Sequence, residues 1–409
     1  MKKLLIIGAG IGQVHIVKLA KQMGLYVIVV SPKGNYPAID IADELFECDI
    51  YEYDKIVEFA RANHIDAVTS DQNDLMVPTV AYVAEHLGLP GNTYEQALSY
   101  CDKNRFREIC RSVNIPVPAS ISVDNTTFPE SFNYPLPWIV KPSDSQSSIG
   151  ISKINSREEY EGAIAYALSK SKHHTAIVEQ FFTGDELVCE GFVYNGKYYN
   201  LFFGDRRYFK GTLIPSQTLF PSLIEEEIKS KILACEQRFS QKVNASFGII
   251  HSEYLVNRQT GEFIVVESAI RGGGVYISSH LVPLATGIDV NTLLLKCALG
   301  EEKDIDIDGY LANHRQGSSA YVCFYLPEGK ITSVEGLEKV AGIPGVAMCD
   351  IRNLEVGHIS EKMVAKGMRK GPILIHGKSR NELENIIEKI QDTIKVKLDN
   401  TASNSTIWR

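Results

Sequence analysis

The sequence predicts a multidomain α/β protein, and three observations support this prediction. Its 409 residues exceed what one hydrophobic core usually organises, so we expect two to four domains. Short apolar strands alternate with helical patterns over the first 95 residues, which is typical of a parallel sheet covered by helices. Later strands follow one another directly, which indicates antiparallel sheets in α+β lobes.

The first predicted domain covers residues 1–95. Apolar runs predict strands at 4–7, 25–30 and 67–69, and a helical pattern around 56–60 lies between the last two. Because strands and helices alternate, neighbouring strands should run parallel, as in a Rossmann-like α/β domain.

The first predicted strand ends in the glycine turn Gly8–Gly12. A dinucleotide fingerprint needs a glycine where Gln13 stands, and an acidic residue at the end of the second strand, where Ser31 stands. The turn therefore argues against an NAD-dependent dehydrogenase. Its backbone N–H groups suit a small anionic substrate at a helix start, and a tight turn without a ligand fits the sequence equally well.

The second predicted domain, residues 96–308, is less regular. We expect residues 118–205 of this domain to act as a lid, and residues 309–409 to form a third, C-terminal α+β lobe. Helices are predicted at 101–113, 158–168, 223–243 and 380–394, and strands at 138–141, 176–181, 186–194, 198–203 and in the hairpin 249–268.

A strand that ends at Lys141 leads into a turn of small hydroxyl residues, which contains Ser147, Ser148 and Ile149. The backbone N–H groups and hydroxyls of such a turn can close over phosphates. Lys141 would place a point charge on the nearest phosphate. A solvated hairpin is the alternative, and the apolar strand that ends in lysine and proline argues against it.

The next strand carries Glu179 and Gln180, and Phe182 and Glu186 follow. An adenine ring needs an apolar slot and one backbone donor–acceptor edge, which Gln180 and Phe182 can offer. Glu179 can accept from the exocyclic amine of adenine, and Glu186 from ribose hydroxyls. Taken singly, such glutamates are usually only solvated surface residues.

The hairpin at 249–268 brings two carboxylates together. A three-residue loop with glycine at position 261 would pair Arg258 with Glu262, and counting back five residues pairs Glu253 with Glu267. The two side chains would lie on one face, about 5 Å apart. Since like charges directly opposite are destabilising, a divalent cation that also binds phosphates and water is the expected occupant. Protonation of one carboxylate, or its rotation toward solvent, is the alternative.

Arg271 follows the hairpin and precedes the glycines 272–274. Glycines let the backbone approach a ligand closely, and Arg271 could hold a carboxylate or a developing acyl phosphate with two parallel hydrogen bonds. A surface arginine in a flexible loop is the competing interpretation. His251 is more often structural in such a place, and the segment Asp205-Arg206-Arg207, which follows a strand, could reach phosphates.

Bulk composition excludes several classes of protein. A net charge of −8 argues against general nucleic-acid binding, which needs a basic face. The eight cysteines are scattered without zinc spacing, which favours reduced thiols in a cytoplasmic protein. Apolar runs fall short of the roughly 18 residues of a membrane span.

Taken together, the ordered motifs resemble the ATP-grasp superfamily, and within it the carboxylate–amine ligases of the L-amino-acid ligase and carnosine synthase type. The resemblance covers nearly the whole chain. It rests on Asp102-Lys103, Ile115-Pro116-Val117-Pro118, the segment 141–151, Glu179 to Glu186, His251-x-Glu253, and Glu267 with Arg271.

The resemblance implies an ADP-forming ligase that joins a small-molecule carboxylate to an amine through an acyl phosphate. It assigns ATP phosphates to Lys103 and Lys141, and magnesium or manganese to the two hairpin glutamates. It further implies that Glu179, Gln180 and Phe182 frame adenine, that Glu186 binds ribose, and that Arg271 faces the acyl phosphate. A homodimer through the N-terminal domain is expected by analogy.

Two departures from the family pattern stand out. Ala269 occupies the place of a frequent asparagine ligand, and the phosphate turn holds more serine than glycine. Two other functions stay open: a carboxylase of the biotin-carboxylase or aminoimidazole-ribonucleotide type, and a nucleotide-binding module without catalysis.

Overall fold

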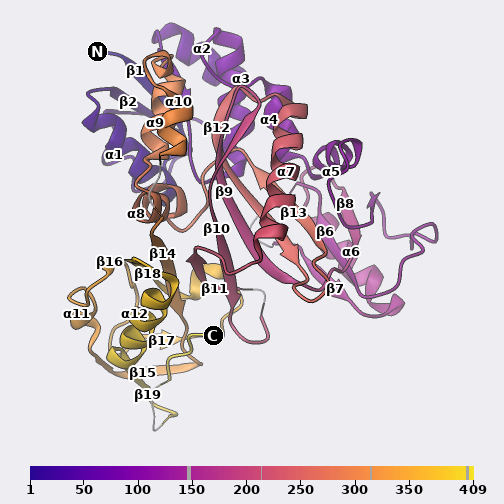
Figure 1. Cartoon of the computed structure of the whole chain (residues 1–409), viewed down its shortest axis with the longest axis vertical. Coiled ribbons are helices and arrows are strands. Elements are labelled where there is room, and N and C mark those ends of the chain that lie inside the picture. Colours follow the sequence, from indigo (N-terminus) through magenta and orange to yellow (C-terminus); the bar gives the residue numbers. More distant parts are fainter. Residues whose placement is uncertain (145–148, 213, 314–315, 402–404) are drawn as a thin grey trace.

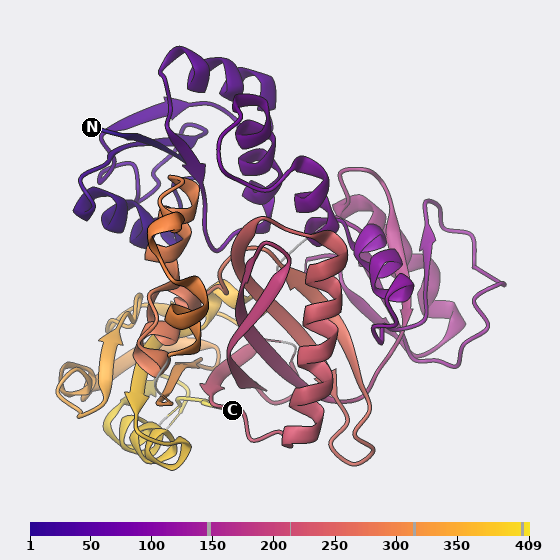
Figure 2. The same cartoon turned by 45° about the horizontal axis from the view of Figure 1, so that its top comes forward.

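The computed structural model describes residues 1–144, 149–212, 214–313, 316–401 and 405–409. Figure 1 shows four regions. An N-terminal domain, a lid and a C-terminal lobe lie around a central sheet. Figure 2 shows the lid and the C-terminal lobe on opposite sides of the central strands.

The N-terminal domain contains a parallel four-stranded sheet in the order β3-β2-β1-β4. Its strands are β1 (Lys3–Ile7), β2 (Tyr26–Ser31), β3 (Glu44–Glu47) and β4 (Ala67–Thr69). Its helices are α1 (Val14–Gln22), α2 (Tyr53–Ala62) and α3 (Val77–Leu87), with the short turns η1 (Ile11–Gln13) and η2 (Asp74–Met76). The three predicted strands and their parallel arrangement are confirmed.

Sequence analysis does not predict strand β3, because β3 is an edge strand of this sheet. Its burial pattern is exposed at both ends and half-buried between them, whereas β1 and β2 are almost fully buried. Helices cover both faces of a parallel sheet, so only its inner strands stand out as continuous apolar runs.

Two helices, α4 (Tyr94–Cys101) and α5 (Lys103–Ser112), lead from this domain to the lid. Only part of the predicted lid, residues 118–205, forms a separate sheet. We call that part the lid: an antiparallel sheet in the order β5-β8-β6-β7, covered by α6 (Tyr160–Lys170) and the short turn η3 (Arg157–Glu159). The strands from residue 185 onward belong to the central sheet instead. Its strands are β5 (Ser120–Val123), β6 (Trp138–Pro142), β7 (Ser152–Ile154) and β8 (Ala176–Gln180). Trp138, Tyr160 and Ile164 belong to its separate hydrophobic core.

The central sheet has eight strands in the order β13-β12-β9-β10-β11-β14-β18-β16. Five come from the middle of the chain: β9 (Asp185–Tyr194), β10 (Lys197–Tyr208), β11 (Pro215–Phe220), β12 (Phe247–Val256) and β13 (Phe263–Ala269). Three come from the C-terminal lobe: β14 (Ser318–Phe324), β16 (Val346–Cys349) and β18 (Lys370–Gly377). One continuous sheet therefore joins the middle of the chain to its C-terminal lobe.

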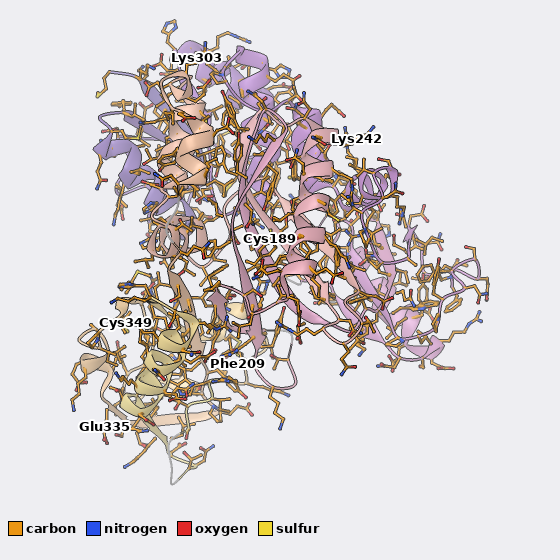
Figure 3. All side chains as sticks on the ribbon, viewed as in Figure 1. Cys189, Phe209, Lys242, Lys303, Glu335 and Cys349 are labelled. Atoms are coloured by element: carbon orange, nitrogen blue, oxygen red, sulfur yellow. The ribbon has the colours of Figure 1, made fainter. Side chains whose placement is uncertain are left out.

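Different elements cover the two faces of the central sheet. Helix α7 (Glu226–Val243) packs on one face, in a core with residues of β9, β10 and β12. The other face packs against η4 (Ile277–Leu281), α8 (Val282–Thr286), α9 (Val290–Ala298) and the N-terminal domain. We call the first the α7 face and the second the cavity face. Cys189 of β9 lies in the interior of the molecule, whereas Lys242 and Lys303 lie at its edge (Figure 3).

The C-terminal lobe adds a small sheet of β15 (Gly329–Glu335), β17 (Ile359–Ser360) and β19 (Lys395–Leu398). Helix α12 (Arg380–Thr393) packs through its apolar stripe, as the helical spacing predicts. The remaining short elements are η5 (Glu302–Asp304), α10 (Ile307–Ala312), α11 (Leu337–Val340) and η6 (Lys366–Met368).

All eight cysteines are free thiols, six of them buried and two half-buried. Among the helices that the structure describes, none combines the length and apolar character needed to cross a bilayer.

Candidate active site

The two hairpin glutamates lie opposite each other, as predicted. Strands β12 and β13 pair antiparallel, and Glu253 is the register partner of Glu267. Both residues line one cavity of about 220 Å³, so their side chains lie on the same face of the sheet. The face on which they lie is the cavity face.

The predicted turn of this hairpin is wrong by one residue. Asn257, and not Arg258, pairs with Glu262: the Asn257 N–H donates to the Glu262 carbonyl at 2.8 Å. The register then shifts between Glu253 and Tyr254, because Val266 is an extra residue on β13. This bulge compensates for the longer loop and restores the predicted carboxylate pair.

The bulge also anchors helix α5. The free carbonyl of Val266 accepts a hydrogen bond from Arg107 Nη2 at 2.7 Å. Arg107 Nε reaches the lid at the same time and donates to Glu179 Oε1 at 3.0 Å. One arginine therefore ties the hairpin that carries the carboxylate pair to the lid.

The carboxylate pair fits a hard divalent cation that is shared with phosphates. In the described part of the chain, no group of three or more histidine, cysteine, aspartate or glutamate residues could hold a metal ion. The side chain of Glu267 has no hydrogen bond or ion pair to any described residue, and Ala269 offers no ligand. Two carboxylates with phosphate oxygens and water are a usual magnesium environment.

Charged side chains surround Glu253 on the cavity face. Arg206 of β10 contacts Glu186 and lies 2.5 Å from Glu253 Oε1, so it bridges the two glutamates. Burial raises the pKa of Glu186 to about 7, with Arg206 opposing the rise and Glu253 adding to it. Burial would also raise the pKa of Glu253, but Arg206 and then His251 hold it well below its ordinary range.

His251 completes this cluster. Its Nδ1 pairs with the fully buried Glu190, and its Nε2 lies 3.3 Å from Glu253 Oε1. Burial lowers the pKa of His251, but the charge and hydrogen bond of Glu190 outweigh it and raise the pKa to about 9. His251 is therefore a charged partner of Glu253, a role that sequence analysis did not assign.

In the lid, Glu179 lies between two cations. Lys141 Nζ is 2.6 Å from Glu179 Oε2, and Arg107 binds the other oxygen. Burial would raise the pKa of Glu179, but Arg107 and Lys141 lower it to about 2. Burial lowers the pKa of Lys141, Glu179 opposes this, and Arg107 and Lys103 lower it further. The excess of positive charge in this cluster suits a phosphate.

The other residues predicted to bind the nucleotide lie on α5 and at the ends of the lid strands. Lys103 is the first residue of α5, as predicted, and it lines a second cavity of about 200 Å³ together with Glu267. Gln180 ends β8, Phe182 follows it, and Ile149 lies exposed in the turn before β7. Ser147 and Ser148 lie outside the described residues.

Arg271 binds the N-terminal domain. Its Nε and Nη2 donate to the two carboxylate oxygens of Asp74 at 2.9 and 2.8 Å. Burial would lower the pKa of Arg271, but Asp74 raises it above its ordinary value. Arg271 also lines the cavity that contains the carboxylate pair, so Asp74 fixes a guanidinium beside that pair.

The glycines after Arg271 permit a close approach to the same domain. The Gly272 N–H donates to the buried Asp71 at 2.8 Å, and Ser278 Oγ donates to the other Asp71 oxygen at 2.9 Å. A β-carbon on Gly272 would lie 2.1 Å from Ser278 Oγ and 2.4 Å from Asp71 Oδ1. Only glycine fits at this position.

Comparison with known protein families identifies three successive regions. Residues 1–93 match the ribonucleotide synthetase preATP-grasp domain, residues 118–267 the D-ala D-ala ligase C-terminus, and residues 322–399 the L-amino acid ligase C-terminal domain 2.

Among individual relatives, the alanine–anticapsin ligase of Bacillus subtilis strain 168 is 26% identical over 288 residues. That match covers 63% of this chain and 59% of the ligase, so it spans little more than half the length of that relative.

Solved structures share the fold. An L-amino acid ligase from Bacillus licheniformis superposes with a TM-score of 0.81 at 22% identity, covering 98% of this chain and 99% of that one. A biotin carboxylase from Campylobacter jejuni superposes with a TM-score of 0.70 at 14% identity, covering 99% and 93%. At these identities, the two likenesses establish the architecture.

Proposed function

We propose that this chain, which belongs to the ATP-grasp superfamily and matches its carboxylate–amine ligases, is an ADP-forming ligase that joins a carboxylate to an amine. The observation that carries the proposal is the paired Glu253 and Glu267 on the wall of a cavity that Arg271 also lines. ATP and a divalent metal ion follow from membership of the superfamily, and Mg²⁺, or Mn²⁺ in its place, is the proposed ion.

In the proposed reaction, the γ-phosphoryl group of ATP passes to a substrate carboxylate and forms an acyl phosphate and ADP. An amine then attacks the acyl carbon, phosphate leaves, and an amide forms with loss of one proton from the amine. The bound metal ion would neutralise charge on the transferring phosphoryl group. The protein itself needs no nucleophilic side chain, because positioning and charge neutralisation carry phosphoryl transfer.

The chain's own residues have distinct proposed roles. Lys141 and Lys103 hold ATP phosphates from the lid and from α5. Arg271, held by Asp74, faces the acyl phosphate and stabilises the negative charge on its oxygens. Gln180 and Phe182 frame adenine, with Glu179 beside its amine and Glu186 near the ribose.

A screen of acid and amine pairs tests the proposal directly. ADP release that requires both an acid and an amine, with the amide identified by mass spectrometry, is the expected result. Glu267→Gln should reduce ADP release by about 10²-fold or more, because the cation loses a ligand. Glu262→Gln, the same change at an exposed position of the same hairpin, is the matched control and should keep full activity.

A bicarbonate-dependent carboxylase is the second candidate, since the biotin carboxylase structure shares the architecture over most of both chains. ATP turnover that requires bicarbonate and ignores amines would establish that function and reject the ligase. ATP binding without turnover under all conditions would instead leave a binding module.

Two finer features accompany the proposal. We infer a cytoplasmic location and a homodimer formed through the N-terminal domain. Light scattering of the purified chain measures the oligomeric state, and a monomer at micromolar concentration would reject the dimer.

A further inference from the structure

A second, larger cavity adjoins the carboxylate pair. It has a volume of about 740 Å³ and lies between the N-terminal domain and the C-terminal lobe. It shares Gln72, Val275, Lys366 and Arg369 with the cavity that contains Glu253 and Glu267. A molecule that reacts beside the carboxylate pair can therefore extend into this space, whose volume is within the roughly 300–1,000 Å³ of small-molecule sites.

Positive charge predominates on the wall of this larger cavity, which we call the basic cavity. Four cations line it, and two acids oppose them: Arg352, Lys366, Arg369 and Lys370 against Asp350 and Glu361. The chain as a whole carries a net charge of −8, so this local excess of cations is opposite in sign to the rest of the molecule. Such a wall attracts anions.

Three of these cations have no carboxylate partner in the described part of the chain. Arg352 pairs with Asp350 at 3.0 Å. In contrast, Lys370 Nζ donates to the carbonyl of Asn353 at 2.9 Å, and Arg369 Nη1 donates to a carbonyl of β11 at 2.6 Å. Lys366 makes no ion pair with a described residue. Arg369 and Lys370 are half-buried cations bonded only to neutral carbonyls, an arrangement that is costly unless an anion joins them.

The cations form a series that starts at the carboxylate pair. Lys366, at the start of η6, lines both the basic cavity and the cavity that contains Glu253. Arg369 also lines both cavities, and its guanidinium lies 5.6 Å from the ring centre of Tyr321. Lys370, the first residue of β18, lines only the basic cavity.

We propose that the basic cavity binds an anionic group, a carboxylate or a phosphate ester, on the end of a substrate away from its reacting atom. This inference rests on the proposed function, because the basic cavity is a substrate site only where chemistry occurs at the carboxylate pair. Lys370 selects the anionic group, and Lys366 and Arg369 lie between that group and the reacting atoms.

Two matched pairs of probes test this specificity. L-Glutamate with L-glutamine, and O-phospho-L-serine with L-serine, differ mainly in a second anionic group. Isothermal titration calorimetry of the full chain should show about tenfold tighter binding of at least one anionic probe than of its neutral partner. A glutamate preference identifies a carboxylate site, and a phosphoserine preference a phosphate site. Equal binding within both pairs, or no binding of either anionic probe, overturns the proposal.

Variants of two neighbouring lysines locate the effect. Lys370→Met removes the charge and keeps most of the apolar stem, so it should lower the preference for the anionic probe about tenfold. Lys362→Met, at an exposed position outside the basic cavity, is the matched control and should leave that preference unchanged. An unchanged preference in Lys370→Met, with a raised KM for ATP, would assign the cation to the nucleotide and overturn the proposal.

The two proposals fail separately. If no pair of acid and amine yields ADP but Lys370→Met weakens the anionic probe, the ligase fails and the anion site stands. If an acid and an amine yield ADP but the probes show no preference, the ligase stands and the anion site fails.

Discussion

A half-buried glutamate and a buried one lie on opposite faces of β12, in opposite electrostatic environments. On the cavity face, Arg206 and His251 hold the pKa of Glu253 well below its ordinary range despite burial. On the α7 face, Glu236 is 2% exposed and accepts a hydrogen bond from Tyr254 at 2.6 Å, and burial raises its pKa to about 7. The fold thus maintains a charge on one face of the strand and favours a neutral acid on the other.

The difference supports the proposal that the cavity face binds the ligand. A fold gains little from buried ion pairs, because desolvation offsets most of their attraction. Glu236 has a hydrogen bond from Tyr254 as its polar partner, and its raised pKa favours the neutral acid. Glu253 has two cationic neighbours that keep it ionised, which is the state that binds a metal ion.

Replacement of Glu253 should cause the largest loss of ADP release among the variants of the two faces. Glu253→Gln removes a ligand of the proposed cation and the partner of Arg206, so ADP release should fall by about 10²–10³-fold. Glu236→Gln makes the same chemical change on the α7 face and should alter ADP release less than twofold. The measurement is coupled-assay ADP release at saturating ATP. Equal losses in the two variants would mean that the faces do not differ in function.

Glu236, on the α7 face, should make the free energy of unfolding depend on pH. Its pKa rises from the ordinary 4.5 to about 7 on folding, so the folded chain retains a proton that the unfolded chain releases. The free energy of unfolding therefore falls as pH rises from 4.5 to 7, and the penalty is complete above pH 7, at about 3 kcal/mol. Glu236→Gln should abolish this slope, as measured by urea unfolding at pH 4 and pH 8. A variant with the unchanged slope would contradict the assignment.

Local patterns predict strands well but not their register. In β12 and β13, the predicted pair of Glu253 and Glu267 is correct because two unpredicted features compensate each other: the loop is one residue longer, and the bulge at Val266 restores the register. The strands of the N-terminal sheet were predictable, since β1 and β2 are continuous apolar runs.

The ionic partners of the site were not predictable, because they come from distant parts of the chain. Arg107 is 72 residues from Glu179, and Asp74 is 197 residues from Arg271. No periodicity or spacing encodes such contacts, which depend on how the lid and the N-terminal domain pack on the central sheet. The segment 205–207 was predicted to reach phosphates, but the place of Arg206 between Glu186 and Glu253 follows only from the antiparallel pairing of β9 with β10 and β12.

Asp74 extends the comparison to a charge pair between domains. Asp74→Asn removes the bidentate partner of Arg271, whose guanidinium then loses its fixed position beside the carboxylate pair. We expect kcat to fall about tenfold to a hundredfold with a smaller change in the KM for ATP, because orientation is lost and not binding. Steady-state kinetics measures this split. A loss confined to the KM for ATP would place Arg271 with the nucleotide and not with the acyl group.

The smallest expected effect comes from Tyr254, whose hydroxyl is the direct partner of Glu236. Tyr254→Phe should lower the free energy of unfolding by about 1 kcal/mol, because a buried oxygen loses its hydrogen bond. The cavity face should be unaffected, so ADP release stays within twofold of the unchanged chain. A double-mutant cycle with Glu236→Gln isolates the pair, and its coupling energy should account for most of the loss. A coupling energy near zero would mean that Tyr254 stabilises the fold through packing alone. Burial would then determine the pKa of Glu236 without this hydrogen bond.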